Sequence, residues 1–258
     1  MHSIDNLYLK LQKIIKNAGE LVEKLKREKY RVIRKSSKEL VTEIDMAVQK
    51  YLEASIKDIT KIPIFFEEDN IINHTELPSE CFIIDPIDAT HNFIAGLPFY
   101  NISVGYVKDN KVEFGLIYFP YSKNIYHAFK GKGAYRNDKK IHVSSNDSIE
   151  KSIVAYDNQF HLEKDAMNNY QKVVSKVFTT RILGSANCDA CFVAEGVLDA
   201  RIWNATKMFD IVAGSIIVKE AGGLVSDFNS KSIDLFHVKE VIMSSSSIHA
   251  SVLDILSA

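Results

Sequence analysis

The feature that most limits the possible folds is a change of hydrophobic period near residue 62. Before this point, apolar residues recur at three- and four-residue steps over 7–25 and again over 44–56. This spacing predicts two amphipathic helices, each with a wide apolar face on a core, and the second helix carries Asp45 near its start.

The middle of the chain has the pattern of strands. Two short apolar runs, 62–66 and 81–84, end at Glu67 and Asp85, so they predict strands that stop at carboxylates. Apolar residues then alternate on both sides of a turn sequence, which predicts an antiparallel meander over 102–118.

The C-terminal part mixes the two patterns. We expect a helix around 163–177 and a strand over 179–183, and Ser185 can cap the helix that follows. Asp210 begins a further apolar helix that ends at Gly222 and its neighbour. Since helices and strands follow one another without a regular βαβ order, the sequence predicts an α+β fold rather than a doubly wound sheet.

Length and charge add further limits. A length of 258 residues fits one or two domains, and we expect a single domain over 1–258 that can be divided into 1–145 and 146–258. The formal net charge of −1 gives no footprint for direct nucleic-acid binding and no attraction to an acidic membrane. No leader pattern and no transmembrane-length apolar stretch is evident, so we expect a cytoplasmic location.

The densest group of chemistry-bearing residues is Asp85-Pro86-Ile87-Asp88-Ala89-Thr90, in which a buried-type strand delivers two carboxylates into a turn. Such acids are costly unless a positive group binds them. Oxygen ligands without nearby histidine or cysteine favour Mg²⁺ or Mn²⁺ over zinc, and the amides of Ala89 and Thr90 would face an anion if they open a helix. A metal beside an anion pocket indicates phosphate chemistry; the alternative is that Asp85 and Asp88 cap the turn and the next helix.

Taken together, the motifs resemble the inositol monophosphatase family of metal-dependent, lithium-sensitive sugar phosphatases, over about 7–256. The resemblance rests on the order and spacing of five sequences: Leu40-Val41-Thr42 with Asp45; Glu67-Glu68; Asp85 to Thr90 with Asn92-Phe93; Gly184-Ser185-Ala186; and Asp210-Ile211-Val212-Ala213-Gly214 followed by Glu220-Ala221-Gly222-Gly223. It implies a layered αβαβα sandwich of the inositol monophosphatase and fructose-1,6-bisphosphatase type, with most metal ligands in 1–145, and usually a homodimer.

The resemblance also implies roles for the residues at matching positions. Two or three Mg²⁺ ions, with Mn²⁺ as a substitute, are expected on a set that offers only oxygen: Glu67, Asp85, the Ile87 carbonyl, Asp88 and Asp210. Thr90, held by Asp45, would work with Glu67 to orient and deprotonate the attacking water. Asp88 and the amides of Ala89 and Thr90 would surround the phosphate. Glu68 would not contact the metal but would orient one of the residues that bind it.

Three positions depart from the family pattern. Ala89 stands where glycine is usual, and a positive φ there would cost alanine about 1 kcal/mol or more. Phe66 replaces a common glycine or serine before the glutamate pair, and Phe209 replaces the usual tryptophan before Asp210. We expect altered packing and retained activity.

A fourth departure concerns the substrate. Inositol-specific members have an acid about seven residues before the aspartate that matches Asp210, and this chain has Trp203 there. Either Lys207 or Arg201 could meet a second phosphate; the alternative for both is a solvated basic side chain. The residues expected on the substrate side are Gly184, Ser185, Ala186, Trp203 and Lys207.

The residues and the resemblance together predict a Mg²⁺-dependent phosphomonoesterase for a small phosphorylated polyol or sugar, with inositol monophosphate as the family default. The first alternative is a fructose-1,6-bisphosphatase or a 3′-phosphoadenosine-5′-phosphate nucleotidase, and the second is a protein- or RNA-associated regulatory factor. The spacing of Asp85 and Asp88 excludes phosphatases that need D-x-D, and no P-loop sequence occurs.

Other sequence features are interpreted as structural or as having no specific function. Cys188 and Cys191 match C-x-x-C inside an apolar helix, where core cysteines are expected. His91 is expected at the surface or in packing. Lys35 and Lys38 fit a solvated turn as well as they fit the family's loop near a third metal. Asn73-His74-Thr75 matches the glycosylation acceptor pattern, which has no role in a cytoplasmic chain.

Overall fold

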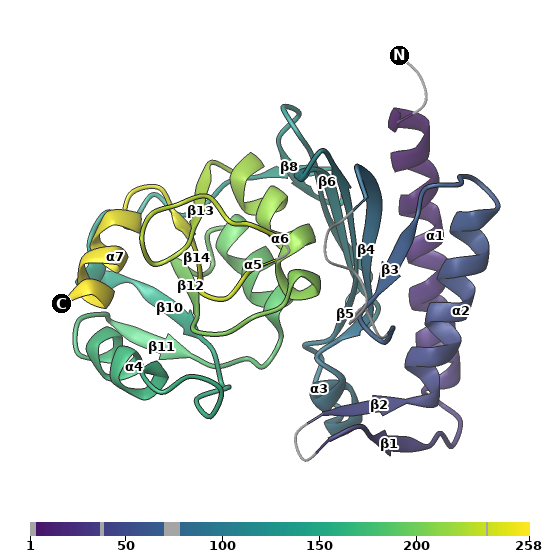
Figure 1. Ribbon diagram of the computed structural model, residues 1–258, viewed down its shortest axis with the longest axis horizontal. Helices are drawn as coiled ribbons and strands as arrows, with labels where there is room; N and C mark the ends of the chain where they lie inside the picture. Colours follow the sequence, from purple (N-terminus) through teal and green to yellow (C-terminus); the bar gives the residue numbers. More distant parts are fainter. Residues whose placement is uncertain (1–3, 37–38, 70–77, 236) are drawn as a thin grey trace.

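The computed structural model describes residues 4–36, 39–69, 78–235 and 237–258, and it stacks its helices and sheets in five alternating layers (Figure 1). Lys38 and the Asn73-His74-Thr75 sequence lie outside the described residues. The layers run helices, sheet, helices, sheet, helices, which confirms the predicted αβαβα sandwich.

The first layer is a helix pair, α1 (Ile4–Leu25) and α2 (Glu43–Lys57), which confirms the two predicted helices. Leu11, Ile15 and Val22 of α1 are fully buried at the spacing of one helix face. Thr42 and Asp45 form a capping box at the start of α2. A hairpin joins the two helices, made of β1 (Val32–Arg34) and β2 (Leu40–Thr42).

The second layer is a sheet whose described strands lie side by side in chain order: β3 (Ile64–Phe66), β4 (Glu80–Asp88), β5 (Asn101–Lys108), β6 (Lys111–Phe119), β7 (Asn124–Phe129), β8 (Ala134–Arg136) and β9 (Lys139–Ile141). Neighbours are antiparallel except β3 and β4, which are parallel. The meander is confirmed, but β4 runs three residues past the predicted end at Asp85. The short helix α3 (Thr90–Ala95) follows.

The third layer is α5 (Ala186–Ala194) and α6 (Met208–Glu220), which lie between the two large sheets (Figure 1). Ser185 caps α5 as predicted, and α6 begins two residues before Asp210. The two helices approach closely where Gly214 faces Ala190. At the far end of α6, Glu220 accepts hydrogen bonds from the amides of Gly131 and Gly133, each at 2.8 Å.

The fourth layer is a mixed sheet, in the spatial order β11 (Thr179–Arg181), β10 (Ile153–Tyr156), β12 (Ala200–Trp203), β14 (Val241–Ser245) and β13 (Gly223–Ser226). Strand β10 is parallel to both of its neighbours, and the other pairs are antiparallel. The outer layer is α4 (Ala166–Val174) and α7 (His249–Ser257), and η2 (Ile149–Lys151) is a single turn before β10.

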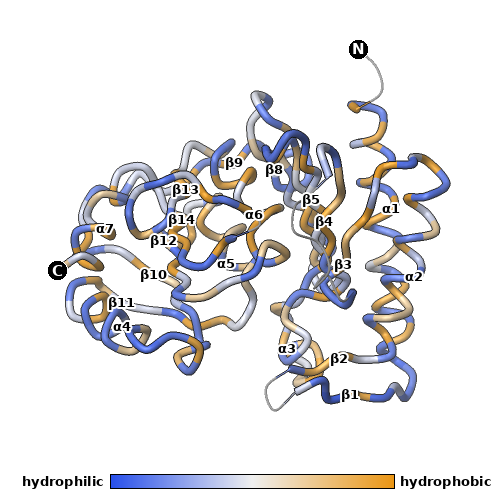
Figure 2. Tube along the Cα trace, in the orientation of Figure 1, coloured by the Kyte–Doolittle hydropathy of each residue, from blue (hydrophilic) through white to orange (hydrophobic). Residues whose placement is uncertain are grey.

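The hydrophobic residues gather between the layers (Figure 2). One buried cluster joins Ile117 and Tyr126 of the first sheet to Val212 of α6 and Met243 of the second sheet, so it crosses the predicted boundary at residue 145. Cys188 and Cys191 are buried and free, as predicted, and Cys81 is also buried and free. In the described part of the chain, no helix has both the length and the apolar character needed to span a membrane.

Candidate active site

Parallel pairing of β3 and β4 brings two predicted ligands to one sheet edge. Phe66 pairs with Ile84 in the register, so Glu67 and Asp85 follow at the carboxyl ends of adjacent strands. The Glu67 amide donates to the Ile84 carbonyl at 3.1 Å. This pairing explains why two apolar runs that end in acids deliver both acids to the same place.

The turn after Asp85 is held by the side chain of Asp85 itself. Asp85 Oδ1 accepts the Ile87 amide at 2.9 Å, and the register of β4 against β5 shifts between Asp85 and Asp88. Ala89 then has φ 65° and ψ 50°, the left-handed conformation in which the family usually has glycine. The expected strain at Ala89 is therefore present.

Asp88 is buried and has three donors on one oxygen. Its Oδ2 accepts from Asn101 Nδ2 at 2.6 Å, from Ser185 Oγ at 2.5 Å and from the Asn187 amide at 3.1 Å. These donors come from β5 and from the start of α5, so both halves of the chain orient this carboxylate. None of these three donors is on the other oxygen, Asp88 Oδ1.

Thr90 connects α3 to α2. Its hydroxyl oxygen lies 3.2 Å from Asp45 Oδ1 and 3.2 Å from the Ile87 carbonyl oxygen. Asp45 is itself held by the Thr42 amide at 2.8 Å and by the Thr42 hydroxyl. The predicted pair of Asp45 and Thr90 is therefore in contact.

Asp210 lies in the first turn of α6, where the helix dipole favours a negative charge. Its Oδ2 accepts from Thr206 Oγ1 at 3.1 Å and from the Lys207 amide at 3.1 Å. Since α6 lies between the sheets, it brings this acid from the C-terminal half toward the acids of β3 and β4.

The acids raise one another's pKa values. Burial is the first cause, and it raises the pKa of Glu67 to about 7 with further contributions from Asp210 and Asp88. Burial raises the pKa of Asp88 to about 6, and burial together with the Glu67 charge raises that of Asp85 well above its usual range. Burial also raises the pKa of Asp210 and that of Asp45. Negative charge is therefore concentrated at this site.

The donor set fits a hard divalent cation, because it consists of carboxylate and carbonyl oxygens. Within the described ranges, no group of three or more histidine, cysteine, aspartate or glutamate side chains is arranged so that it could hold a metal ion. The assignment of individual ligands therefore stays a prediction.

The residues predicted on the substrate side differ in placement. Gly184 has φ 71°, Ser185 caps α5, and Ala186 opens that helix. Trp203 is only 2% exposed, beneath the guanidinium of Arg201, and Arg201 itself is paired with buried Asp189. Arg201 is thus buried in an ion pair, so it is neither the solvated side chain nor the contact for a second phosphate that the sequence suggested.

Lys207 is the basic side chain that reaches the acids. Its Nζ lies 3.9 Å from Glu67 Oε1 and 3.2 Å from Glu39 Oε1, with 59% of the side chain exposed. On the other side of Glu67, Glu68 pairs with Lys35. The exposed His91 has the surface position expected of it.

Sequence reasoning missed two donors to Asp88, namely Asn101 and Asn187. Asn101 is the residue opposite Asp88 in the register of β4 and β5. Asn187 is fully buried in the first turn of α5, two residues after the cap. A signal was available in the family motif Gly184-Ser185-Ala186, which ends one residue before Asn187.

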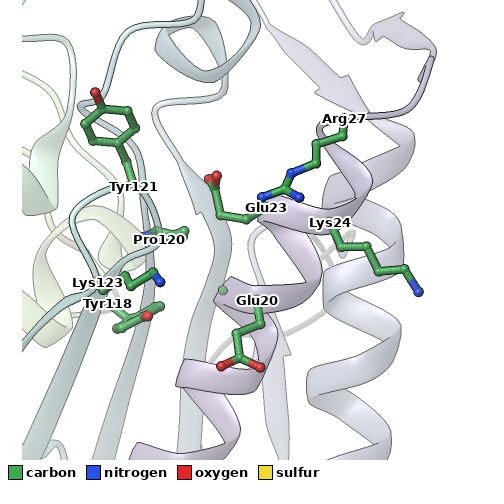
Figure 3. Close-up of a pocket in the computed structure, with 9 residues that line it drawn as sticks. Glu20, Glu23, Lys24, Arg27, Tyr118, Pro120, Tyr121 and Lys123 are labelled. Carbon is green, nitrogen blue, oxygen red and sulfur yellow. The ribbon is translucent and has the colours of Figure 1, made fainter.

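A pocket of about 410 Å³ lies elsewhere, between α1 and the turn after β6. Figure 3 shows Glu20, Glu23 and Arg27 on α1, with Tyr121 and Lys123 on the facing turn. Its lining mixes both signs of charge and includes none of the acids described above. It is therefore separate from the acidic site.

Comparison with known proteins identifies the family. The inositol monophosphatase family matches residues 4–257. The chain is 35% identical over 222 residues to the fructose-1,6-bisphosphatase/inositol-1-monophosphatase of Thermotoga maritima, covering 85% of this chain and 83% of the relative. It is 34% identical over 239 residues to inositol monophosphatase 1 of Bos taurus, covering 88% and 85%.

Solved structures share the fold. The Thermotoga maritima IMPase has a TM-score of 0.85 at 32% identity, covering 95% of this chain and 94% of that chain. An IMPase/NADP phosphatase solved with Mg²⁺ and phosphate has a TM-score of 0.84 at 25% identity, covering 99% and 95%. The match over nearly the whole chain carries with it a phosphatase activity that requires a divalent metal. The chain belongs to the inositol monophosphatase family of metal-dependent phosphoric monoester hydrolases.

Proposed function

We propose that this protein hydrolyses the phosphate ester of a small phosphorylated polyol or sugar, with two or three Mg²⁺ ions as cofactors. The residues proposed to bind them are Glu67, Asp85, the Ile87 carbonyl, Asp88 and Asp210, and Mn²⁺ is a substitute. The observation that carries the proposal is the convergence of acids from separate elements with raised pKa values. A bound cation relieves both their burial and their repulsion.

When bound, Mg²⁺ would lower the pKa of the attacking water and would neutralise charge on the attacking and leaving oxygens. The chain's own groups orient that water. Thr90 accepts a proton from the water on its hydroxyl oxygen while its own proton passes to Asp45 Oδ1, 3.2 Å away. Glu67 fixes the second hydrogen of the water. The raised pKa of Asp45 favours its acceptance of the proton.

The phosphate is proposed to lie beside Asp88 and against the amides of Ala89 and Thr90. The left-handed backbone of Ala89 sets the direction in which the chain enters α3, and so the direction of the Thr90 amide. Ala89 takes part through its backbone, which is why alanine can replace glycine there.

The test is phosphate release from inositol-1-phosphate at mildly alkaline pH, with Mg²⁺ and with a chelator. We expect turnover only with the metal, and a loss of about 100-fold or more in Asp85→Asn, because a neutral amide replaces a buried anionic ligand. Asp109→Asn, at an exposed turn, is the matched control and should keep wild-type turnover. Equal turnover by Asp85→Asn and the wild type would overturn the proposed site.

A sugar bisphosphate is the second candidate substrate, and Lys207 favours it. Its ammonium stands beside Glu67 and is largely solvent-exposed, so it has reach for a second phosphate. The Thermotoga relative carries both activities in its name. We expect Lys207→Met to lower kcat/KM for fructose-1,6-bisphosphate about tenfold more than kcat/KM for inositol-1-phosphate, the value of one charge-assisted hydrogen bond. Equal losses on both substrates would remove the role.

Further expectations are proposed on the sequence alone. A nucleotidase would show turnover of 3′-phosphoadenosine-5′-phosphate in the same assay. The homodimer is checked by sedimentation equilibrium. A regulatory role is checked by a pull-down at native salt, and a cytoplasmic location by fractionation.

A further inference from the structure

A buried ion pair behind the acidic site has no part in the proposed chemistry. Arg201 lies on β12, the middle strand of its sheet, with its Nε 3.1 Å from Asp189 Oδ2 on α5. Their side chains are 5% and 0% exposed. The guanidinium carbon also lies 4.5 Å from the centre of the Trp203 ring. Arg201 therefore packs on Trp203 of its own strand and pairs by charge with Asp189 of α5.

Stability alone does not account for this pair. A buried ion pair recovers its desolvation cost only when its remaining polar atoms are hydrogen-bonded, and apolar replacement is often neutral or stabilising. Among the described residues, Arg201 Nε and Nη1 and both carboxylate oxygens of Asp189 have no hydrogen-bond partner, so the two side chains are held together by charge and packing alone. The side-chain amide of Asn187, in the same turn of α5, has none either. A role in positioning the first turn of α5 would explain why Arg201 and Asp189 are charged.

The pair restrains the turn of α5 that holds Asp88. Ser185 Oγ and the Asn187 amide both donate to Asp88 Oδ2. The Asp189 amide donates to the Ser185 carbonyl at 3.2 Å, so all three residues belong to one helical turn. A displacement of Asp189 therefore moves both donors relative to Asp88.

We propose that Arg201 is a positioning residue, whose ion pair with Asp189 fixes the first turn of α5 and thereby orients the Asp88 carboxylate in the active site. This rests on the metal-binding role proposed above for Asp88. The charge of Arg201 also favours the ionised form of Asp189, because it opposes the rise that burial causes in the pKa of that carboxyl.

The test removes both charges together, because a single change would leave one charge buried alone. For Asp189→Leu/Arg201→Met we measure urea unfolding, Mg²⁺ affinity by calorimetry without substrate, and kcat and KM. We expect a folded protein whose Mg²⁺ binding is at least tenfold weaker and whose kcat is at least tenfold lower, with KM changed less than threefold. The single variant Arg201→Lys, which keeps the positive charge, should keep a Mg²⁺ affinity within about threefold of wild type.

A matched control lies at the other end of the same helix. Arg136 Nη1 is 2.6 Å from Glu195 Oε1, the C-cap residue of α5. Arg136→Met/Glu195→Gln should lower the unfolding free energy without changing Mg²⁺ affinity. If both double variants lose stability and keep wild-type Mg²⁺ affinity and kcat, Arg201 is structural only and the proposal is wrong.

The outcome for Asp88→Asn separates this proposal from the one on which it rests. If that variant binds Mg²⁺ as tightly as wild type, the ligand role of Asp88 fails. If it binds weakly while the folded Asp189→Leu/Arg201→Met protein stays within twofold of wild type, the positioning role fails. Should the double variant not fold, Asp189→Asn replaces it, with Arg201→Lys as the control that keeps the charge, and wild-type Mg²⁺ affinity and kcat in Asp189→Asn would also overturn the role of Arg201.

Discussion

Ala89 is under backbone strain that glycine would relieve. Its φ of 65° lies in the left-handed region, which costs a residue with a Cβ about 1–2 kcal/mol. Glycine enters that region without this cost, although the greater freedom of its unfolded chain takes back about 0.5–1 kcal/mol. We therefore expect Ala89→Gly to raise the free energy of unfolding by about 0.5–1 kcal/mol.

The assay is urea unfolding in the presence of a chelator, so that bound metal does not contribute, with the m-value checked for constancy. Ala54→Gly is the control, because Ala54 is exposed within α2 and glycine there should cost about 1 kcal/mol. The same chemical change should thus have opposite signs at the two positions. A loss of stability in Ala89→Gly similar to that in Ala54→Gly would refute the argument.

Three further predictions concern pH, capping and packing. Burial raises the pKa of Glu67 to about 7 and that of Asp88 to about 6, so the folded metal-free protein binds more protons than the unfolded chain between about pH 4 and pH 7. Its stability should therefore fall as pH rises through that window. Glu67→Gln should reduce this fall, measured as melting temperature in the presence of a chelator, and an unchanged fall would contradict the prediction. Ser185→Ala removes the α5 cap and a donor to Asp88, and should lower the unfolding free energy by about 1–2 kcal/mol in urea; no loss would show that the cap is unimportant. Gly214→Ala would place a Cβ 2.6 Å from that of Ala190, which forces α5 and α6 apart, and should cost about 1–3 kcal/mol by thermal unfolding; a wild-type melting temperature would mean that the helices yield freely.

Local patterns were sufficient for the two N-terminal helices, the meander, α5, α6 and the motif residues, but strands β10, β12, β13 and β14 and helix α7 were not predicted. Strong periodicity located α1, and the acids that end β3 and β4 were visible as residues that no apolar strand would otherwise carry. The partners of Asp88 were not visible, because Asn101 depends on strand register and Asn187 depends on where α5 packs. Arg201 was offered for a phosphate because its sequence neighbours do not reveal that α5 covers its face of β12. The individual ligand roles remain predictions that the variants above test.

The apolar character of α6 also has a consequence for the order of folding. This helix is hydrophobic on every side, and such a helix is stable only when covered all round. We therefore expect α6 to dock only after both sheets have formed, and to bring Asp210 with it. The three other acids of the proposed ligand set, Glu67, Asp85 and Asp88, precede it in the chain, so a partly synthesised protein has them without the helix that completes the set. If these acids bind the cation as proposed, we expect its capture to be delayed until folding is finished. Mg²⁺ added during refolding should then stabilise the last step and leave the earlier steps unaffected.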